Sequence, residues 1–151
     1  MGTNLVSSTT LIAHSNNFHS NYPADRLWDG CTDTGITPPC LTASDTSSSY
    51  WVEFDFGGQY TLTSARLFGD ASGIWQSRSW TLKYKANQQD PWITAFASIN
   101  AAINDWITQN LAGKLARYVR VEVEGNPEVP ATEARELEIY GMPAAISAHD
   151  L

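Results

Sequence analysis

Trp75 and Arg78 stand close together in a stretch, Gly69 to Arg78, whose other residues predict a loop. Gly and Ser are frequent there, and a core indole would be difficult to pack in such a segment. An exposed indole offers a flat apolar face, and a neighbouring guanidinium offers a fork of hydrogen-bond donors. The pair is therefore our first candidate for ligand binding. A loop anchor or a partner contact are the alternatives for Trp75, and a solvated strand-end charge is the alternative for Arg78.

A second polar stretch, His14 to Asn21, contributes further candidates: Asn17, Phe18 and His19. Asn and His are also ordinary turn residues, and Phe18 could close the end of a hydrophobic core instead of stacking on a ligand. Asn126, in a Gly-Asn-Pro turn, is a lower-ranking ligand candidate.

Length and charge restrict the classes of function. The chain has 151 residues, and 9 basic against 16 acidic residues give a net charge of −7. We expect a single domain, residues 1–151, with its core at about 4–141 and a short tail at 142–151. The negative charge excludes nucleic acid as a partner and opposes an anionic membrane surface. There is no apolar run of about 18 residues to span a membrane, and the first residues do not resemble a secretory signal.

Period-two alternation predicts an all-β chain. Five segments carry the pattern: Tyr50–Phe56, Leu62–Phe68, Trp80–Lys85, Tyr118–Glu124 and Glu136–Tyr140. Turn residues such as Gly57-Gly58 and Gly125-Asn126-Pro127 separate them. Strands with one apolar face and one polar face favour an antiparallel β-sandwich.

Two segments depart from this period. Phe96, Ile99, Ile103 and Trp106 have helical spacing, which favours a short helix over an irregular strand. Tyr22 to Trp28 predicts one helical turn that begins at a proline. Apart from Trp75, all the tryptophans are expected to belong to the core: Trp28, Trp51, Trp80, Trp92 and Trp106.

Three separated strings resemble those of coagulation factor 5/8 type C (discoidin-like) domains and family 32 carbohydrate-binding modules. They are Tyr22–Gly30 (YPADRLWDG), Trp51–Gly57 (WVEFDFG), and Arg117–Val121 (RYVRV) followed by Glu136–Gly141 (ELEIYG). The resemblance implies a galactose-binding-like jelly roll with a ligand site in the loops at one end. It also implies a neutral glycan ligand, most readily a galactose-type sugar. The 32–49 stretch is longer than is usual in the family.

The same resemblance implies a structural calcium ion, a hard cation that takes six to eight oxygen ligands. The positions that match its ligands are Asp29, Asp33, Thr34 and Glu136, with Glu136 reaching across from the last strand. The alternative is that Asp29-Gly30 is simply a turn and Glu136 a surface residue.

Cys31 and Cys40 enclose eight residues. This spacing matches no zinc pattern, because the usual close pairs of ligands are missing. A disulfide is geometrically allowed in an oxidising compartment, and two separate thiols are the alternative.

These observations predict a non-catalytic carbohydrate-binding or lectin-like domain, extracellular or surface-associated as part of a larger protein or assembly. The sequence contains no G-x-S-x-G elbow, no H-E-x-x-H and no Gly-rich phosphate loop. The alternative function is a structural or protein-interaction domain, for example of a virion, tail or cell-surface assembly, without a sugar ligand. Assembly state and glycan binding would separate the two.

Overall fold

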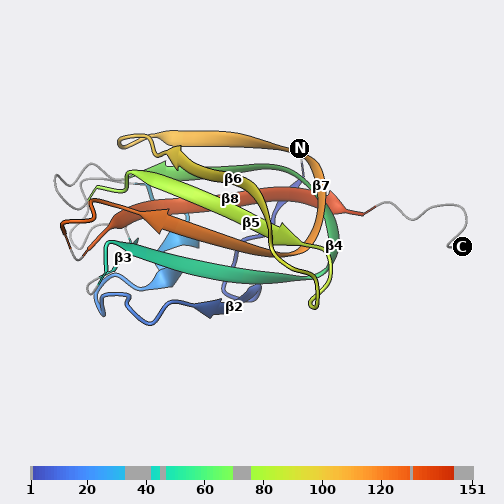
Figure 1. Cartoon of the computed structure of the whole chain (residues 1–151), viewed down its shortest axis with the longest axis horizontal. Helices are drawn as coiled ribbons and strands as arrows, with labels where there is room; N and C mark the ends of the chain where they lie inside the picture. Colours follow the sequence, from blue (N-terminus) through green and yellow to red (C-terminus); the bar gives the residue numbers. More distant parts are fainter. Residues whose placement is uncertain (1, 33–41, 45–46, 70–75, 130, 145–151) are drawn as a thin grey trace, which may run out of the picture.

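The computed structural model is built almost entirely of β-strands (Figure 1). It describes residues 2–32, 42–44, 47–69, 76–129 and 131–144. The strands are β1 (Thr3–Asn4), β2 (Leu11–His14), β3 (Thr42–Ala43), β4 (Ser49–Gly69), β5 (Ser79–Lys85), β6 (Ile93–Asn100), β7 (Trp106–Glu124) and β8 (Glu133–Pro143). A 3₁₀ turn, η1 (Ala24–Trp28), confirms the predicted helical turn, with Pro23 as its N-cap. Among the described residues, no helix has the length and apolar character needed to cross a membrane.

The long strands β4 and β7 each run through both layers of the sandwich. The first half of β4 pairs with β2 and with the second half of β7, which in turn pairs with β5. The second half of β4 pairs with β8 and with the first half of β7. The register of β4 and β7 breaks between Asp55 and Tyr60, where both strands bend at the right-hand end of Figure 1. All these ladders are antiparallel, so the predicted β-sandwich is confirmed.

A glycine allows this bend, because Gly57 has a φ of 82°, a region that residues with a Cβ rarely enter. Gly113, with a φ of 72°, lies at the second irregularity of the ladder, opposite the step from Leu62 to Ser64. We call this end of the sandwich, formed by residues 57–60, 86–92 and 112–115, the bend end. The opposite end, where β4 and β8 begin and β7 ends, is the loop end.

The core lies between the two layers and follows the predicted alternation. Val52 and Phe54 of β4 are fully buried, as are Val119, Val121 and Val123 of β7. In the facing layer, the buried residues are Leu62 and Leu67 in the second half of β4 and Leu137 and Ile139 in β8. The strands therefore form because alternate apolar side chains can share a core while polar ones face outward.

The helix favoured for Phe96 to Trp106 is wrong. Phe96 and Ile99 lie in β6, opposite Leu82 and Trp80 of β5. A step of three residues along β6 therefore corresponds to a step of two residues along β5. Ser98, between Phe96 and Ile99, has a φ of 49°. This bulge turns residues three apart toward the same face, and the ring of Phe96 lies 4.7 Å from that of Trp80. A strand with a bulge thus imitates helical spacing.

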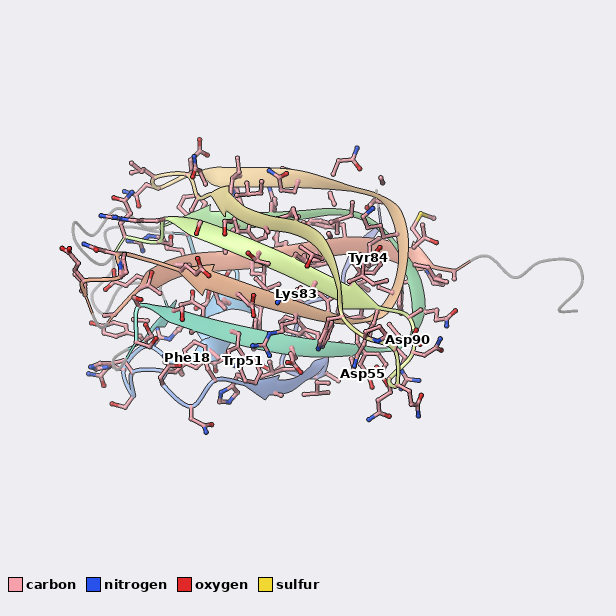
Figure 2. All side chains as sticks on the ribbon, in the orientation of Figure 1. Phe18, Trp51, Asp55, Lys83, Tyr84 and Asp90 are labelled. Atoms are coloured by element: carbon pink, nitrogen blue, oxygen red, sulfur yellow. The ribbon has the colours of Figure 1, made fainter. Side chains whose placement is uncertain are left out.

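The core role expected for the tryptophans holds for Trp80, which is fully buried, but not for three others. These three are partly exposed, and each carries a cation over its ring. The pairs are Arg120 with Trp51 at 4.1 Å, Arg66 with Trp106 at 3.8 Å and Lys85 with Trp92 at 4.6 Å. Figure 2 shows Trp51 on the strand β4. These three tryptophans therefore form cation–π contacts at the surface instead of filling the core.

A bidentate ion pair joins β4 to β7 beside the bend. Arg117 donates from Nε and Nη2 to the two carboxylate oxygens of Asp55, at 2.7 and 3.1 Å. Gly57 N also donates to Asp55 Oδ1, at 2.9 Å. The Arg117 side chain, ahead of the Gly57 backbone bond, holds the pKa of Asp55 below its ordinary value, against the opposing effect of desolvation.

We predict that Asp55→Asn lowers the melting temperature by a few degrees at pH 7. Because the pKa of Asp55 is lowered in the folded state, its ionised form stabilises the protein above the unfolded pKa. That stability is lost as the pH falls through the folded pKa. Thermal denaturation of both proteins from pH 7 to pH 2 checks this; a difference that stays constant down to pH 2 would contradict it.

Candidate functional site

Hydrogen bonds bring three separate segments together at the loop end. His19 N donates to Ala43 O at 2.8 Å, which joins the segment after β2 to β3. Thr132 N donates to Ser44 Oγ at 2.9 Å, which joins the segment before β8 to the same place. Gly125 N donates to Ser48 O at 2.8 Å. The segments at 15–22, 42–48 and 125–132, in their described parts, therefore form one surface.

Arg78 joins this surface through its backbone and leaves its side chain exposed. Its N donates to Glu124 O at 2.8 Å, and its O accepts from Ala101 N at 2.9 Å. Next to it, Ser77 is fully buried. Within the described residues, the guanidinium of Arg78 makes no ion pair. Arg78 thus has an anchored backbone and an exposed donor side chain, whereas Trp75, its predicted neighbour, lies outside the described residues.

Asn17 and Phe18 have structural roles at this end. Asn17 Nδ2 donates to Ser49 O at 2.8 Å, which ties the loop to the start of β4. The Phe18 ring packs 4.9 Å from Tyr50 and 5.5 Å from His14, against the edge of the core. Figure 2 shows Phe18 beside the first half of β4. Of the two readings left open for Phe18, these contacts match closure of the core.

His19 and Asn126 also hold their own loops. His19 Nδ1 accepts from Asn21 N at 3.1 Å, and its ring lies 5.1 Å from that of Tyr22. The accepting Nδ1 leaves Nε2 as the protonated nitrogen, a donor that a ligand could use. Asn126 Oδ1 accepts from Glu128 N at 3.0 Å and closes an Asx turn.

The predicted calcium ligands Asp29 and Glu136 are adjacent. Glu136, only 3% exposed, accepts from Gly30 N at 3.0 Å and shares a hydrogen bond with Asp29. Burial, followed by the hydrogen bond and charge of Asp29, raises the pKa of Glu136 to about 9. Glu136 is therefore a buried group and not the surface residue of the alternative reading. Asp33 and Thr34 lie outside the described residues.

Cys31 is disulfide-bonded. Cys40, the partner predicted for it, lies outside the described residues, so their pairing stays a prediction.

Sequence patterns did not reveal the buried polar side chains near the loop end. They are Thr42, Ser44, Ser77, Thr132 and Arg135. Ser and Thr in a turn-rich segment look like solvated surface, and an arginine is rarely fully buried, although Arg135 shares the alternation of Leu137 and Ile139. The polar residues immediately flanking the short strands were the available signal, because loop backbones need side-chain partners when they are buried.

We predict that Phe18→Ala lowers the free energy of unfolding by about 2 kcal/mol, since the half-buried ring leaves a gap against Tyr50. Urea denaturation at neutral pH checks this. An unchanged unfolding free energy, together with lost binding to glycans, would instead make Phe18 a ligand-stacking residue.

Comparisons with known proteins agree with this architecture. A fucose binding module from Streptococcus pneumoniae is 14% identical, with a TM-score of 0.68 over 92% of this chain and 95% of that chain. A mutant lectin binding domain of Lectinolysin, complexed with Lewis b, is 17% identical, with a TM-score of 0.71 over 96% and 99%. Chitosan-binding module 1 of a chitosanase/glucanase from Paenibacillus sp. IK-5 is 21% identical, with a TM-score of 0.65 over 92% and 99%.

The comparison with curated proteins found no similar sequence. The F5/8 type C domain family matches residues 8–137, which includes most of the three strings found in the sequence. The chain belongs to the F5/8 type C domain family.

Proposed function

We propose that this chain is a carbohydrate-binding domain that recognises neutral glycans, galactose-type sugars first, through its loop end. The observation that carries the proposal is its likeness, over 96% of its length, to a lectin binding domain complexed with Lewis b. Arg78 supplies an exposed fork of donors, and His19 Nε2 supplies one more donor on the same surface.

Charge supports neutral over acidic glycans. The chain carries a net charge of −7, which repels acidic sugars at long range. One stacked ring and a few hydroxyl contacts must also offset the entropy of association. A single site should therefore bind with a dissociation constant of about 0.1 to 1 mM.

A binding role without catalysis is supported by the state of the outer carboxylates. Glu53 and Glu122 both contact Arg120, and Asp55 contacts Arg117. Glu138 pairs with Arg66. Glycoside hydrolysis needs one carboxyl that holds a proton and a second beside it that is ionised, both within reach of the substrate. These four carboxylates are each engaged with an arginine, and in the Asp29–Glu136 pair, which does share a proton, Glu136 is only 3% exposed.

We infer an extracellular or surface-associated setting for the domain. The disulfide bond of Cys31 requires an oxidising compartment, and such bonds are rare in the cytosol.

We also propose that Asp29 and Glu136 hold a structural calcium ion. Two carboxyl groups share a hydrogen bond here, and one of them is buried, an arrangement that a cation would stabilise in place of the shared proton. The described residues contain no group of three or more His, Cys, Asp or Glu side chains around one point. Backbone carbonyls and the proposed Asp33 and Thr34 would therefore have to complete the set.

We predict that Arg78→Ala weakens glycan binding about tenfold or more, because hydrogen bonds from a charged donor are lost. A glycan array finds the ligand, and titration calorimetry measures it. Lys114→Ala, which removes the same charge at the bend end, is the matched control. Equal binding by wild type and Arg78→Ala would place the site elsewhere, and a wild type that binds no glycan would contradict the function.

We predict that calcium raises the melting temperature by several degrees and that EDTA reverses the rise. Glu136→Gln should keep the metal-free stability, since an amide can still donate to Asp29, but lose the response to calcium. Differential scanning fluorimetry with and without calcium measures both. A wild-type melting temperature indifferent to EDTA and to added calcium would contradict the proposal.

A further inference from the structure

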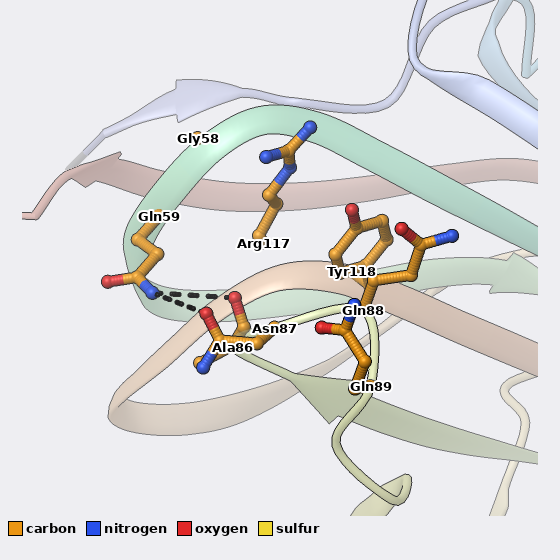
Figure 3. A pocket seen from close by; sticks show the side chains of 8 residues that line it. All are labelled: Gly58, Gln59, Ala86, Asn87, Gln88, Gln89, Arg117 and Tyr118. Carbon is orange, nitrogen blue, oxygen red and sulfur yellow. Dashed lines mark hydrogen bonds between the residues drawn. The ribbon is translucent and has the colours of Figure 1, made fainter.

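A pocket of about 390 Å³ lies at the bend end, far from the loop end in the fold (Figure 3). The turn between the halves of β4, the loop after β5 and the second half of β7 form its walls. Its lining residues are Gly58, Gln59, Ala86, Asn87, Gln88, Gln89, Arg117 and Tyr118. Its volume is in the range of small-molecule sites.

The pocket is rich in carboxamides. Gln88 and Gln89 are exposed, and their side-chain amides make no hydrogen bond within the described part of the chain. Gln59 Nε2 lies 3.4 Å from both Ala86 O and Asn87 Oδ1, so that Gln59 links the two turns across the pocket (Figure 3). Each carboxamide offers a donor and an acceptor side by side, as each pair of neighbouring sugar hydroxyls does.

The charge of the pocket is balanced. Among the described residues that line the pocket, Arg117 alone is charged, and its Nε and Nη2 donate to the carboxylate of Asp55. Nη1 of Arg117 has no hydrogen-bond partner among the described residues. An anionic ligand would meet the carboxylate of Asp55, whereas a neutral hydroxyl can accept from Nη1 without displacing that carboxylate.

The loop that carries the glutamines is held in place. Lys85 Nζ donates to Gln88 O at 2.9 Å and lies over the rings of Trp92 and Tyr118. Asp90 accepts from both Asn87 N and Asn87 Nδ2 at 3.2 Å. A fixed loop loses less conformational entropy when a ligand binds.

From these contacts we propose that the bend-end pocket is a second binding site, for a neutral saccharide. Gln88, Gln89 and Arg117 Nη1 form its hydrogen-bonding groups, with the Tyr118 ring as its wall. The site is separate from the loop end, so it stands or falls independently of the proposed function. Two sites at opposite ends would let one domain bridge two glycan chains and bind a polymer with raised avidity.

Chemical-shift mapping on the ¹⁵N-labelled chain tests the proposal, with methyl β-D-galactopyranoside and L-fucose as probes. We expect at least one probe to cause saturable shifts at Gly58, Gln59 and Asn87–Gln89. Gln88→Ala should weaken the bend-end binding about tenfold and leave the melting temperature unchanged, because the side chain is exposed and unbonded. Asn100→Ala, an exposed amide on β6, is the matched control and should change neither.

The outcomes separate the two proposals. Shifts confined to the loop end, or bend-end shifts that Gln88→Ala leaves intact, would overturn the second site and leave the proposed function standing. Bend-end shifts that persist in Arg78→Ala, with none at the loop end, would support the second site and contradict the loop-end site. D-galacturonate should bind the pocket no tighter than the neutral probes; tenfold tighter binding would overturn the ligand class.

Discussion

The pairing of β4 with β7 across their common bend is the constraint on which the rest of the molecule depends. The two strands stay hydrogen-bonded from Ser49 opposite Glu124 to Phe68 opposite Trp106, with a break only at the bend and a short irregularity beyond it. Each strand therefore contributes to both layers, and the layers cannot separate without breaking the longest ladder. The Asp55–Arg117 pair and Gly57, which has a left-handed backbone, lie at the bend, where ladder hydrogen bonds are interrupted.

This arrangement gives the two ends of the sandwich different characters. At the bend end, chain reversals within β4 and β7 are tight, and the space between them is lined by amides. At the loop end, segments from distant parts of the chain meet, and buried hydroxyls join them, as Ser44 joins the backbone of Thr132. Long, separately anchored loops can vary in sequence without disturbing the core, which suits that end to ligand recognition.

Sequence patterns predicted the features that neighbouring residues determine, but not those that depend on contacts between residues far apart in the chain. Tyr118 to Glu124 was correctly predicted as a strand because one buried face imposes a period of two on neighbouring residues. Phe96 to Trp106 was not, because a bulge at Ser98 changes the period locally and leaves no distinct mark in the sequence. Trp51 was expected in the core, although its alternation with Val52 placed it outside; only the pairing of β4 with β7 brings Arg120 over its ring. Asp29 and Glu136, 107 positions apart, were brought together by family resemblance rather than by pattern.

The site residues named from the sequence stay predictions. Arg78, which its loop context singled out, is exposed, as ligand binding requires, while Asn17 and Phe18 make contacts within the fold. Residue type identified the polar side chains in the loops. Only the three-dimensional contacts show which of these side chains already form hydrogen bonds with neighbouring backbone groups. The most direct test of the central claim is a crystal structure of the chain with the glycan that it binds best on an array. We predict density for a sugar at the loop end, within hydrogen-bonding distance of Arg78. A sugar bound away from that surface, with Arg78 still in solvent, would contradict the account.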